Sequence, residues 1–134
     1  MQVCTYWLDT IKKESMVKSK YEELRDPSWT TCPVDYTKTR IAGKWKILIL
    51  WHIHNSEVIR YGELKKMVTG ITHKMLSNQL KELIEFDLVH KELYHQVPPK
   101  TEYSLTEKGK TLVPILDLMF EWGVNNMRQE EAAQ

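Results

Sequence analysis

Polar side chains that suit the reading of DNA bases follow one face of a short segment in the middle of the chain. They combine hydrogen-bond donors, acceptors and positive charge, at His73, Lys74, Ser77, Asn78 and Lys81. The opposite face carries apolar residues with helical spacing, at Leu76, Leu80, Leu83 and Ile84. The segment therefore predicts an amphipathic helix with one core face and one face that can meet base edges.

The order along this helix assigns a role to each polar residue. If this is the second helix of a helix-turn-helix, its N-terminal part meets base edges in the major groove, so His73 and Lys74 come first, before Ser77 and Asn78. Asn78 can make paired hydrogen bonds to adenine, and Lys74 can approach O6 and N7 of guanine. The phosphates are served by Thr72, Ser77 and Lys81.

Both ends of the helix are visible in the sequence. Thr72 predicts the start, because its hydroxyl can accept a hydrogen bond from the first unpaired backbone N–H groups. The helix is expected to end near Phe86. Asp87 stands where the chain leaves it, in the left-handed conformation that aspartate tolerates better than most residues.

Other segments with the periodicity of helices or strands surround this helix. In order, they are a helix over 34–41, an apolar helix from Gly43 through Ile53 that Asn55-Ser56 breaks, a strand over 58–61, a two-turn helix over 62–68 with Leu64 and Met67 inward, and strands over 89–94 and 101–105. Segments 3–15 and 17–24 have weak helical periodicity.

The last two expected elements are a loop and a long helix. Residues 95–100 contain two prolines, which predict a projecting loop between the two strands and not a tight turn. Thr106 caps the final helix, and Pro114 lies well inside it and is expected to bend it.

This order of elements is that of a winged helix-turn-helix, mainly α-helical with a small β wing. Six fragments in the right order also resemble the HxlR-type transcriptional regulators. They are Cys32-Pro33-Val34, Gly43-Lys44-Trp45 with Leu48-Ile49-Leu50, Tyr61-Gly62-Glu63-Leu64, the stretch from Ile71 to Leu76, the stretch from Val97 to Gly109, and Glu121-Trp122-Gly123. The resemblance implies a homodimeric, MarR-like regulator of a bacterium or archaeon that binds operator DNA and represses or activates genes.

The sequence departs from the usual family pattern at two positions. Asp87 stands where the family usually has glycine, and Lys91 where it usually has arginine. A lysine is a point charge and lacks the two-pronged fork with which arginine holds a phosphate. Lys91 and Lys100 on the wing are expected to contact the DNA backbone or the neighbouring minor groove.

The chain divides into three expected parts. They are a weakly helical N-terminal extension over 1–31, the HxlR-type domain over 32–123, and an acidic C-terminal tail over 124–134. Terminal helices are expected to form the dimer, because the last helix has more apolar surface than one small domain covers. Its expected interface residues are Leu112, Ile115, Met119, Phe120 and Trp122. In a rival interpretation residues 1–31 fold back over this surface, and in another the native protein begins at Met16.

Composition and charge agree with a DNA-binding protein of the cytoplasm, associated with the nucleoid. The longest apolar run, Ile47–Trp51, is far shorter than the roughly 20 residues that cross a bilayer, and two cysteines are too few for a disulfide scaffold. The net charge is only +1, but residues 61–81 hold four lysines against one glutamate. Residues 111–134 hold four acidic residues against one arginine, so the basic segment would face a polyanion.

Other chemistry is not expected. No nucleophile, base and orienting group can be grouped from the sequence, so we predict neither an enzyme, a cofactor nor a metal site. Trp45, Trp51 and Trp122 are interpreted as core residues more than as a ligand cage. The alternative function is a winged-helix protein-interaction module without sequence-specific DNA binding. A small-molecule effector is a further partner that the family resemblance implies.

Cys32 has two interpretations. It precedes a helix whose N-terminal dipole, with Lys38 and Arg40 nearby in sequence, favours a thiolate that senses oxidants or electrophiles. The other interpretation is a small buried residue that anchors the start of the domain, since many cysteines are buried and inert.

Overall fold

The computed structural model describes residues 24–134, which form two compact units that divide after Arg40. The expected helices over 3–15 and 17–24 lie outside the described residues, apart from Leu24, as does Cys4. The first unit contains most of α3, Pro33–Ile41, which confirms the helix expected over 34–41. The second unit contains all the remaining helices and strands of the described chain.

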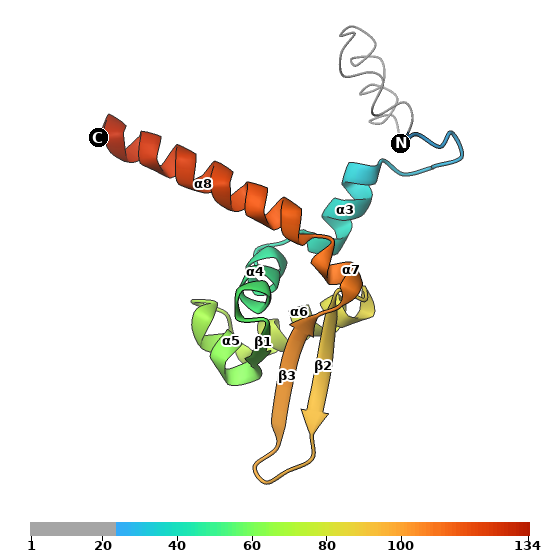
Figure 1. The fold of residues 1–134 in the computed structure, drawn as a ribbon, viewed down its shortest axis with the longest axis vertical. Coiled ribbons are helices and arrows are strands. Elements are labelled where there is room, and N and C mark those ends of the chain that lie inside the picture. The colour runs from blue at the N-terminus through green and yellow to red at the C-terminus, as the bar shows by residue number, and fades with distance from the viewer. Residues whose placement is uncertain (1–23) are drawn as a thin grey trace, which may run out of the picture. The chain divides into compact units, whose positions relative to one another are not determined.

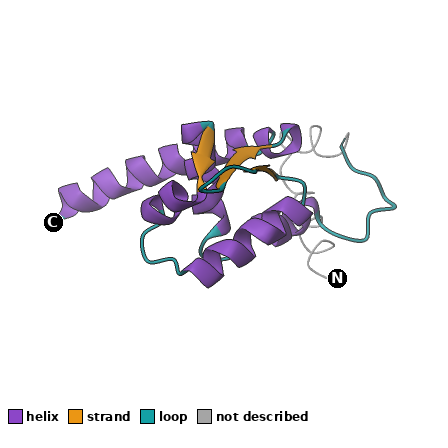
Figure 2. Ribbon diagram, turned by 90° about the horizontal axis from the view of Figure 1, so that it is seen from below, coloured by secondary structure: helices purple, strands orange, loops and turns teal. Residues whose placement is uncertain are grey.

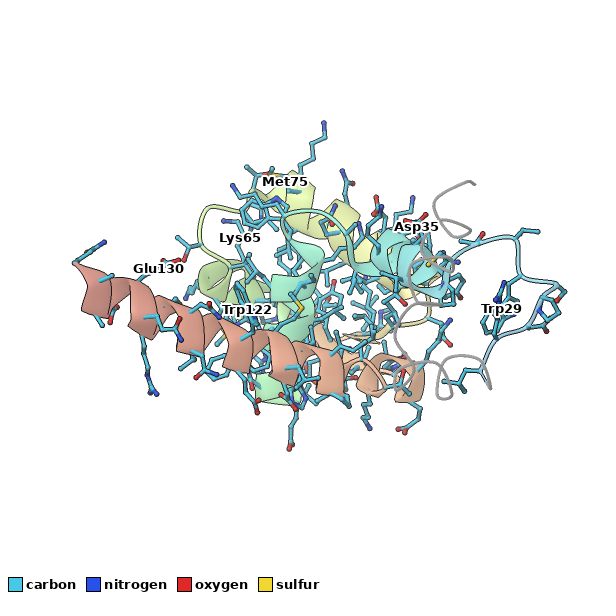
Figure 3. The ribbon with its side chains drawn as sticks, turned by 90° about the horizontal axis from the view of Figure 1, so that it is seen from above. Trp29, Asp35, Lys65, Met75, Trp122 and Glu130 are labelled. Carbon is cyan, nitrogen blue, oxygen red and sulfur yellow. The ribbon has the colours of Figure 1, made fainter. Side chains whose placement is uncertain are left out.

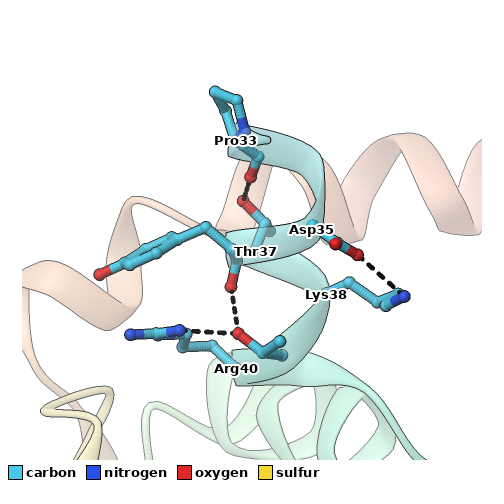
Figure 4. Close-up of polar contacts among 7 residues, drawn as sticks. Pro33, Asp35, Thr37, Lys38 and Arg40 are labelled. Atoms are coloured by element: carbon cyan, nitrogen blue, oxygen red, sulfur yellow. Dashed lines mark hydrogen bonds and ion pairs between the residues drawn. The ribbon is translucent and has the colours of Figure 1, made fainter. Parts of the chain in front are cut away.

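Helix α3 carries its charges where the helix dipole favours them. Asp35 lies in its first turn, and Lys38 and Arg40 lie in its last turn. The Thr37 hydroxyl donates to the Pro33 carbonyl at 3.0 Å, and Lys38 pairs with Asp35 at 2.9 Å (Figure 4).

The second unit has the element order of a winged helix-turn-helix (Figure 1). In chain order the elements are α4 Lys46–Ser56, β1 Val58–Arg60, α5 Tyr61–Met67, α6 His73–Glu85, β2 Val89–Tyr94, β3 Lys100–Leu105, α7 Glu107–Lys110 and α8 Val113–Ala133. Helices dominate, and the strands form one small sheet (Figure 2). The predicted fold class is confirmed.

The sheet is antiparallel in the order β1-β3-β2. Ile59 pairs with Tyr103, and Tyr103 also pairs with Lys91, so these three side chains lie on the same face of the sheet. Near β1 this face is turned toward the core. Ile59 and Tyr103 are buried. Strands β2 and β3 extend past β1 as a hairpin that projects from the helices (Figure 1), as expected for the wing.

The core is formed where α4 meets α6 and the sheet. Three residues of α4 are fully buried, at Ile49, Leu50 and Ile53, and Leu76 and Leu83 of α6 are equally buried. Burying one such side chain contributes about 1.5 to 3 kcal/mol. Within residues 24–134, no helix is both long and apolar enough to cross a membrane.

The predicted threonine cap of α6 is confirmed, whereas Thr106 caps the short α7 and not the final helix α8. Thr72 accepts from the Met75 N–H at 3.2 Å at the start of α6, and Thr106 accepts from the Gly109 N–H at 2.9 Å. Asp87 leaves α6 with a φ of +59°, in the left-handed region.

The prediction of one bent final helix was wrong. The chain forms α7 and α8 as separate helices, and Pro114 stands in the first turn of α8. A proline is tolerated there because the first N–H groups of a helix have no partner within the helix. Helix α8 then continues to Ala133, through the residues expected to form an acidic tail.

Several expected details of burial and helix ends also differ. Met67 is 46% exposed, because Val68, just past the end of α5, takes the inward position. Ile84 lies at the exposed edge of the apolar stripe of α6, and Leu83 takes the buried position beside it. Trp45 is buried, but Trp122 is 70% exposed, so the core interpretation was wrong for Trp122. Helix α4 begins at Lys46 and includes Asn55-Ser56, where a break was expected.

Gly109 allows α7 to lie directly against the turn between α6 and β2. A Cβ atom at this position would overlap the carbonyl oxygen of Leu88. Thr106 strengthens the same junction, since its hydroxyl donates to the Asp87 carbonyl at 2.6 Å and its N–H donates to the Leu88 carbonyl at 3.1 Å.

Gly109→Ala is therefore expected to lower the free energy of unfolding by about 1 to 3 kcal/mol, because the backbone at Leu88 has to move. Urea denaturation measures the loss. Gly62→Ala is the matched control, since a Cβ at Gly62 meets open space, and its effect should stay below about 1 kcal/mol. Equal stability of the Gly109→Ala variant and the wild type would contradict this close approach.

Candidate nucleic-acid interface

Helix α6 presents its polar residues to solvent because its apolar stripe is buried. Leu76, Leu80 and Leu83 face the core. The predicted contact residues of the helix and its cap are all exposed, at Thr72, His73, Lys74, Ser77, Asn78 and Lys81. The structure therefore brings these six predicted residues together on one surface.

An ion pair between a buried lysine and a half-exposed glutamate joins α4 to α6. The Lys46 side chain is 9% exposed, and its Nζ lies 2.5 Å from Oε2 of Glu82. A charge removed from water is stabilised only when it is paired, so the two helices are tied at this point. The role of Lys46 was not predicted from the sequence, because a lysine at the first position of an apolar helix resembles an exposed helix end.

Positive charge on the exposed surface is available to a partner. Within residues 24–134, Lys74, Lys81 and Lys91 form no ion pair. All three are exposed. Such charges attract phosphates without first having to break a contact within the protein.

The two predicted lysines of the wing differ from one another. Lys91 pairs across the strands with Tyr103 and Lys100 pairs with Tyr94, so they lie on opposite faces of the hairpin. The Lys100 ammonium is 3.0 Å from Glu102 and 4.3 Å from the centre of the Tyr94 ring, and its side chain is 22% exposed. Lys100 is therefore engaged within the wing, whereas Lys91 is open to solvent.

Tyr61 joins the start of α5 to the start of α6. Its hydroxyl lies 3.1 Å from the His73 carbonyl oxygen, 3.1 Å from Oγ of Ser77 and 3.3 Å from Nδ1 of His73. Its ring stacks on the His73 ring at 5.8 Å and is tilted against the Tyr103 ring at 6.5 Å. Burial raises the pKa of the Tyr103 phenol, and neighbouring Tyr61 raises it further, so Tyr103 stays neutral beneath the surface.

Two residues of this surface escaped the sequence analysis. Tyr61 entered it only as part of a family fragment, since its contacts to α6 depend on the turn between the two helices. Met75 is 40% exposed on α6 (Figure 3). It directly precedes Leu76 of the buried stripe, which could have placed it at the edge of the polar face. An apolar side chain there can contact the methyl group of thymine.

The predicted dimer residues divide into two groups. Ile115, Met119 and Trp122 line a shallow groove on α8 together with Leu118 (Figure 3 labels Trp122). Phe120 is more than half exposed but stacks on Trp51 of α4 at 5.1 Å. Leu112 precedes α8 and packs against the core of its own chain.

Cys32 is half-buried directly before α3, and its carbonyl accepts from the Tyr36 N–H at 2.9 Å.

The described part of the chain contains no group of three side chains that could hold a metal ion.

A helix held by its leucine stripe, an exposed polar face and a projecting β hairpin together define a winged helix-turn-helix protein. The HxlR-like helix-turn-helix family model matches residues 40–131. The chain belongs to this family, which confirms the resemblance seen in the sequence.

Proteins similar to this chain are named as regulators. A Fusobacterium mortiferum protein named as the regulatory protein MalR is 54% identical over 95 residues, which cover 71% of this chain and 90% of that protein. The redox regulator HypR in its reduced form is 46% identical, with a TM-score of 0.70, over 75% of this chain and 99% of HypR. Its oxidised form matches with a TM-score of 0.67 at 48% identity, over 70% and 96%. A MarR-family regulator of Porphyromonas gingivalis W83 is 44% identical, with a TM-score of 0.70, over 76% and 99%.

Removing one partner of the ion pair between α4 and α6 tests its structural role. Glu82→Gln should lower the free energy of unfolding by about 1 to 3 kcal/mol, because it leaves the Lys46 charge buried without a counter-charge. In the double variant with Lys46→Met, part of this loss should be recovered.

Thermal and urea unfolding of both single variants and the double variant measures the coupling. Glu107→Gln is the control, because it breaks the well-exposed pair with Lys110, which should contribute less than about 1 kcal/mol. Additive losses from Lys46→Met and Glu82→Gln would show that the pair does not hold α6.

Proposed function

We propose that this protein is a sequence-specific DNA-binding transcriptional regulator that places α6 in the major groove. The observation that carries the proposal is the exposed polar face of α6, with Lys74 and Lys81 outside any ion pair of the described chain. The similarity to proteins named as regulators supports it. The protein then acts on genomic DNA, in the cytoplasm at the nucleoid.

The contacts divide between bases and phosphates. Asn78 and Lys74 lie on the exposed face and have the chemistry to read adenine and guanine. Thr72 uses its oxygen to cap α6, which leaves its hydroxyl hydrogen to donate to a phosphate. Lys81 on the helix and Lys91 on the wing supply charge to the backbone.

The alternative function is a protein-interaction module that has no sequence preference for DNA. A protein-interaction module does not require exposed lysines, such as Lys74 and Lys81, on both sides of Asn78 on an exposed helix. DNA binding explains both features, and the two functions differ in what the Asn78 variant does.

Asn78→Ala should lose discrimination among DNA sequences, at a cost of about 1 to 3 kcal/mol for one bidentate base contact. Lys91→Ala should weaken binding to every sequence alike and reduce the salt dependence, because it removes a phosphate contact. Gel-shift titrations on DNA selected from a random pool and on unselected DNA measure both effects.

Lys100→Ala is the matched lysine on the other face of the wing and should have the smaller effect, because its charge already pairs with Glu102. If the Asn78 and Lys91 variants bind both kinds of DNA as the wild type does, the interaction module is the better account.

We further propose that the protein binds as a homodimer to a two-fold-related site with half-sites about one helical turn apart, roughly 34 to 36 Å. The dimer surface is the groove on α8, whose lining residues are at least 40% exposed, at Ile115, Leu118, Met119 and Trp122. An apolar surface of this kind marks a site of protein contact, and a second copy provides a matching surface by symmetry.

Met119→Asp and Trp122→Asp should each weaken the dimer at least about 100-fold, because the new charge is buried without a partner. Sedimentation over a range of concentrations measures this, and circular dichroism shows whether the monomer remains folded. Asp117→Asn is the control on the same helix and should leave the dimer intact. A wild-type monomer that binds a palindromic site tightly would contradict the proposal.

Cys32 is the proposed redox or electrophile sensor. The protein is similar to the redox regulator HypR in both its forms, and Cys32 lies at the start of α3, where the helix dipole favours a thiolate. A covalent adduct on Cys32 would add bulk beside the first helix and change the separation of two recognition helices that must match a fixed groove spacing. The small-molecule effector that would form this adduct is an electrophile, such as a quinone.

Quinone or maleimide treatment should reduce DNA binding by the wild type and leave the Cys32→Ser variant unaffected. Gel shifts with and without the reagent measure this, and Cys4→Ser is the control. If the wild type and the Cys32→Ser variant respond equally, Cys32 is not the sensor and has only a structural role.

A further inference from the structure

The Tyr61 hydroxyl meets three polar atoms at the first turn of α6. They are the His73 carbonyl oxygen at 3.1 Å, Oγ of Ser77 at 3.1 Å and Nδ1 of His73 at 3.3 Å. The Tyr61 and His73 rings lie nearly parallel, 12° apart, so the phenol and the imidazole hold each other in place. This cluster lies at the end of α6 that enters the groove first under the proposed function.

The hydrogens of this cluster can be assigned by counting donors. A phenol has one hydrogen to donate and can accept two hydrogen bonds. A carbonyl oxygen only accepts, so the Tyr61 hydrogen goes to the His73 carbonyl. The other two contacts can then form only if Ser77 and Nδ1 of His73 donate to the Tyr61 oxygen.

We propose that Tyr61 is a positioning residue that holds neutral His73 with its hydrogen on Nδ1 and so makes Nε2 a hydrogen-bond acceptor for an exocyclic amino group in the major groove. This inference rests on the proposed function. A neutral imidazole carries its hydrogen on either nitrogen, and the hydrogen bond made by one nitrogen sets the state of the other. Within residues 24–134, Nε2 of His73 forms no hydrogen bond, and the side chain is exposed.

The acceptor at Nε2 has a definite base preference. In the major groove only adenine N6 and cytosine N4 donate hydrogen bonds, whereas guanine and the thymine carbonyl accept them. His73 therefore favours adenine or cytosine at one position of each half-site. The same cluster changes the role of Ser77, whose hydroxyl hydrogen is directed to Tyr61 and not to a phosphate.

The first experiment measures the hydrogen position without DNA. Two-bond ¹H–¹⁵N correlation spectra of the full-length protein, recorded at about pH 8.5 where imidazole side chains are neutral, distinguish the two nitrogens. The His73 signals are identified with His73→Gln. The wild type should carry the hydrogen on Nδ1, and Tyr61→Phe, which keeps the stacked ring and removes only the hydroxyl, should move part of it to Nε2.

Tyr103→Phe is the control, because it removes the hydroxyl of the neighbouring tyrosine, which forms no hydrogen bond to His73 in the described chain. It should leave the His73 signals unchanged. A hydrogen on Nε2 in the wild type, or identical His73 spectra in the wild type and the Tyr61→Phe variant, would overturn the proposal whether or not the protein binds DNA.

The second experiment selects binding sites from random DNA with the wild type and Tyr61→Phe. The variant should lose its preference for adenine or cytosine at one position per half-site by about 2- to 10-fold, the range for one hydrogen bond. Identical preferences would overturn the base readout. A wild type that selects no sequence would overturn the proposed function as well, while the position of the hydrogen on His73 is measured independently.

Discussion

The surface that we propose as the DNA interface depends on how one helix is held. The Leu76, Leu80 and Leu83 side chains of α6 are buried against α4 and the sheet, and this burial sets which residues of the helix can face outward. The pair between Lys46 and Glu82 adds a directional contact, because an ion pair has to meet at particular atoms while apolar packing tolerates some rotation. Rotating α6 by one residue would place a lysine in the core.

The wing is tied to the same helix through the backbone. Asp87 turns the chain out of α6 in a left-handed conformation and leads directly into β2. Thr106 binds this turn from the other side, by hydrogen bonds to the Asp87 and Leu88 carbonyls, and caps α7 with the same hydroxyl. Helix α6 and the wing are therefore joined by a short junction that several hydrogen bonds hold. A protein that contacts a groove and its neighbouring backbone at the same time needs such a fixed angle between the two elements.

The sequence predicted the elements whose pattern is local. The leucine stripe of α6, the two threonine caps and the left-handed Asp87 each follow from spacing or from the chemistry of a single residue. The contacts of Lys46 and Tyr61 could not be predicted in this way, since Glu82 and His73 come near them only after the chain has folded. Pro114 shows a different failure. Its apolar neighbours continue the helical pattern on both sides, so the pattern gave no sign that a new helix begins at Val113. Lys100 was rightly placed on the wing, but its pairing with Glu102 depends on the cross-strand register.

The central claim is that the polar face of α6 is the surface that meets DNA. Its most direct test is a titration of the ¹⁵N-labelled full-length protein with a duplex that the protein has selected from random DNA, followed by amide chemical shifts. We predict the largest changes at residues 72–81 and on the β2–β3 hairpin, with α8 beyond Trp122 nearly unchanged. Changes concentrated on α8, with residues 72–81 unaffected, would contradict this account.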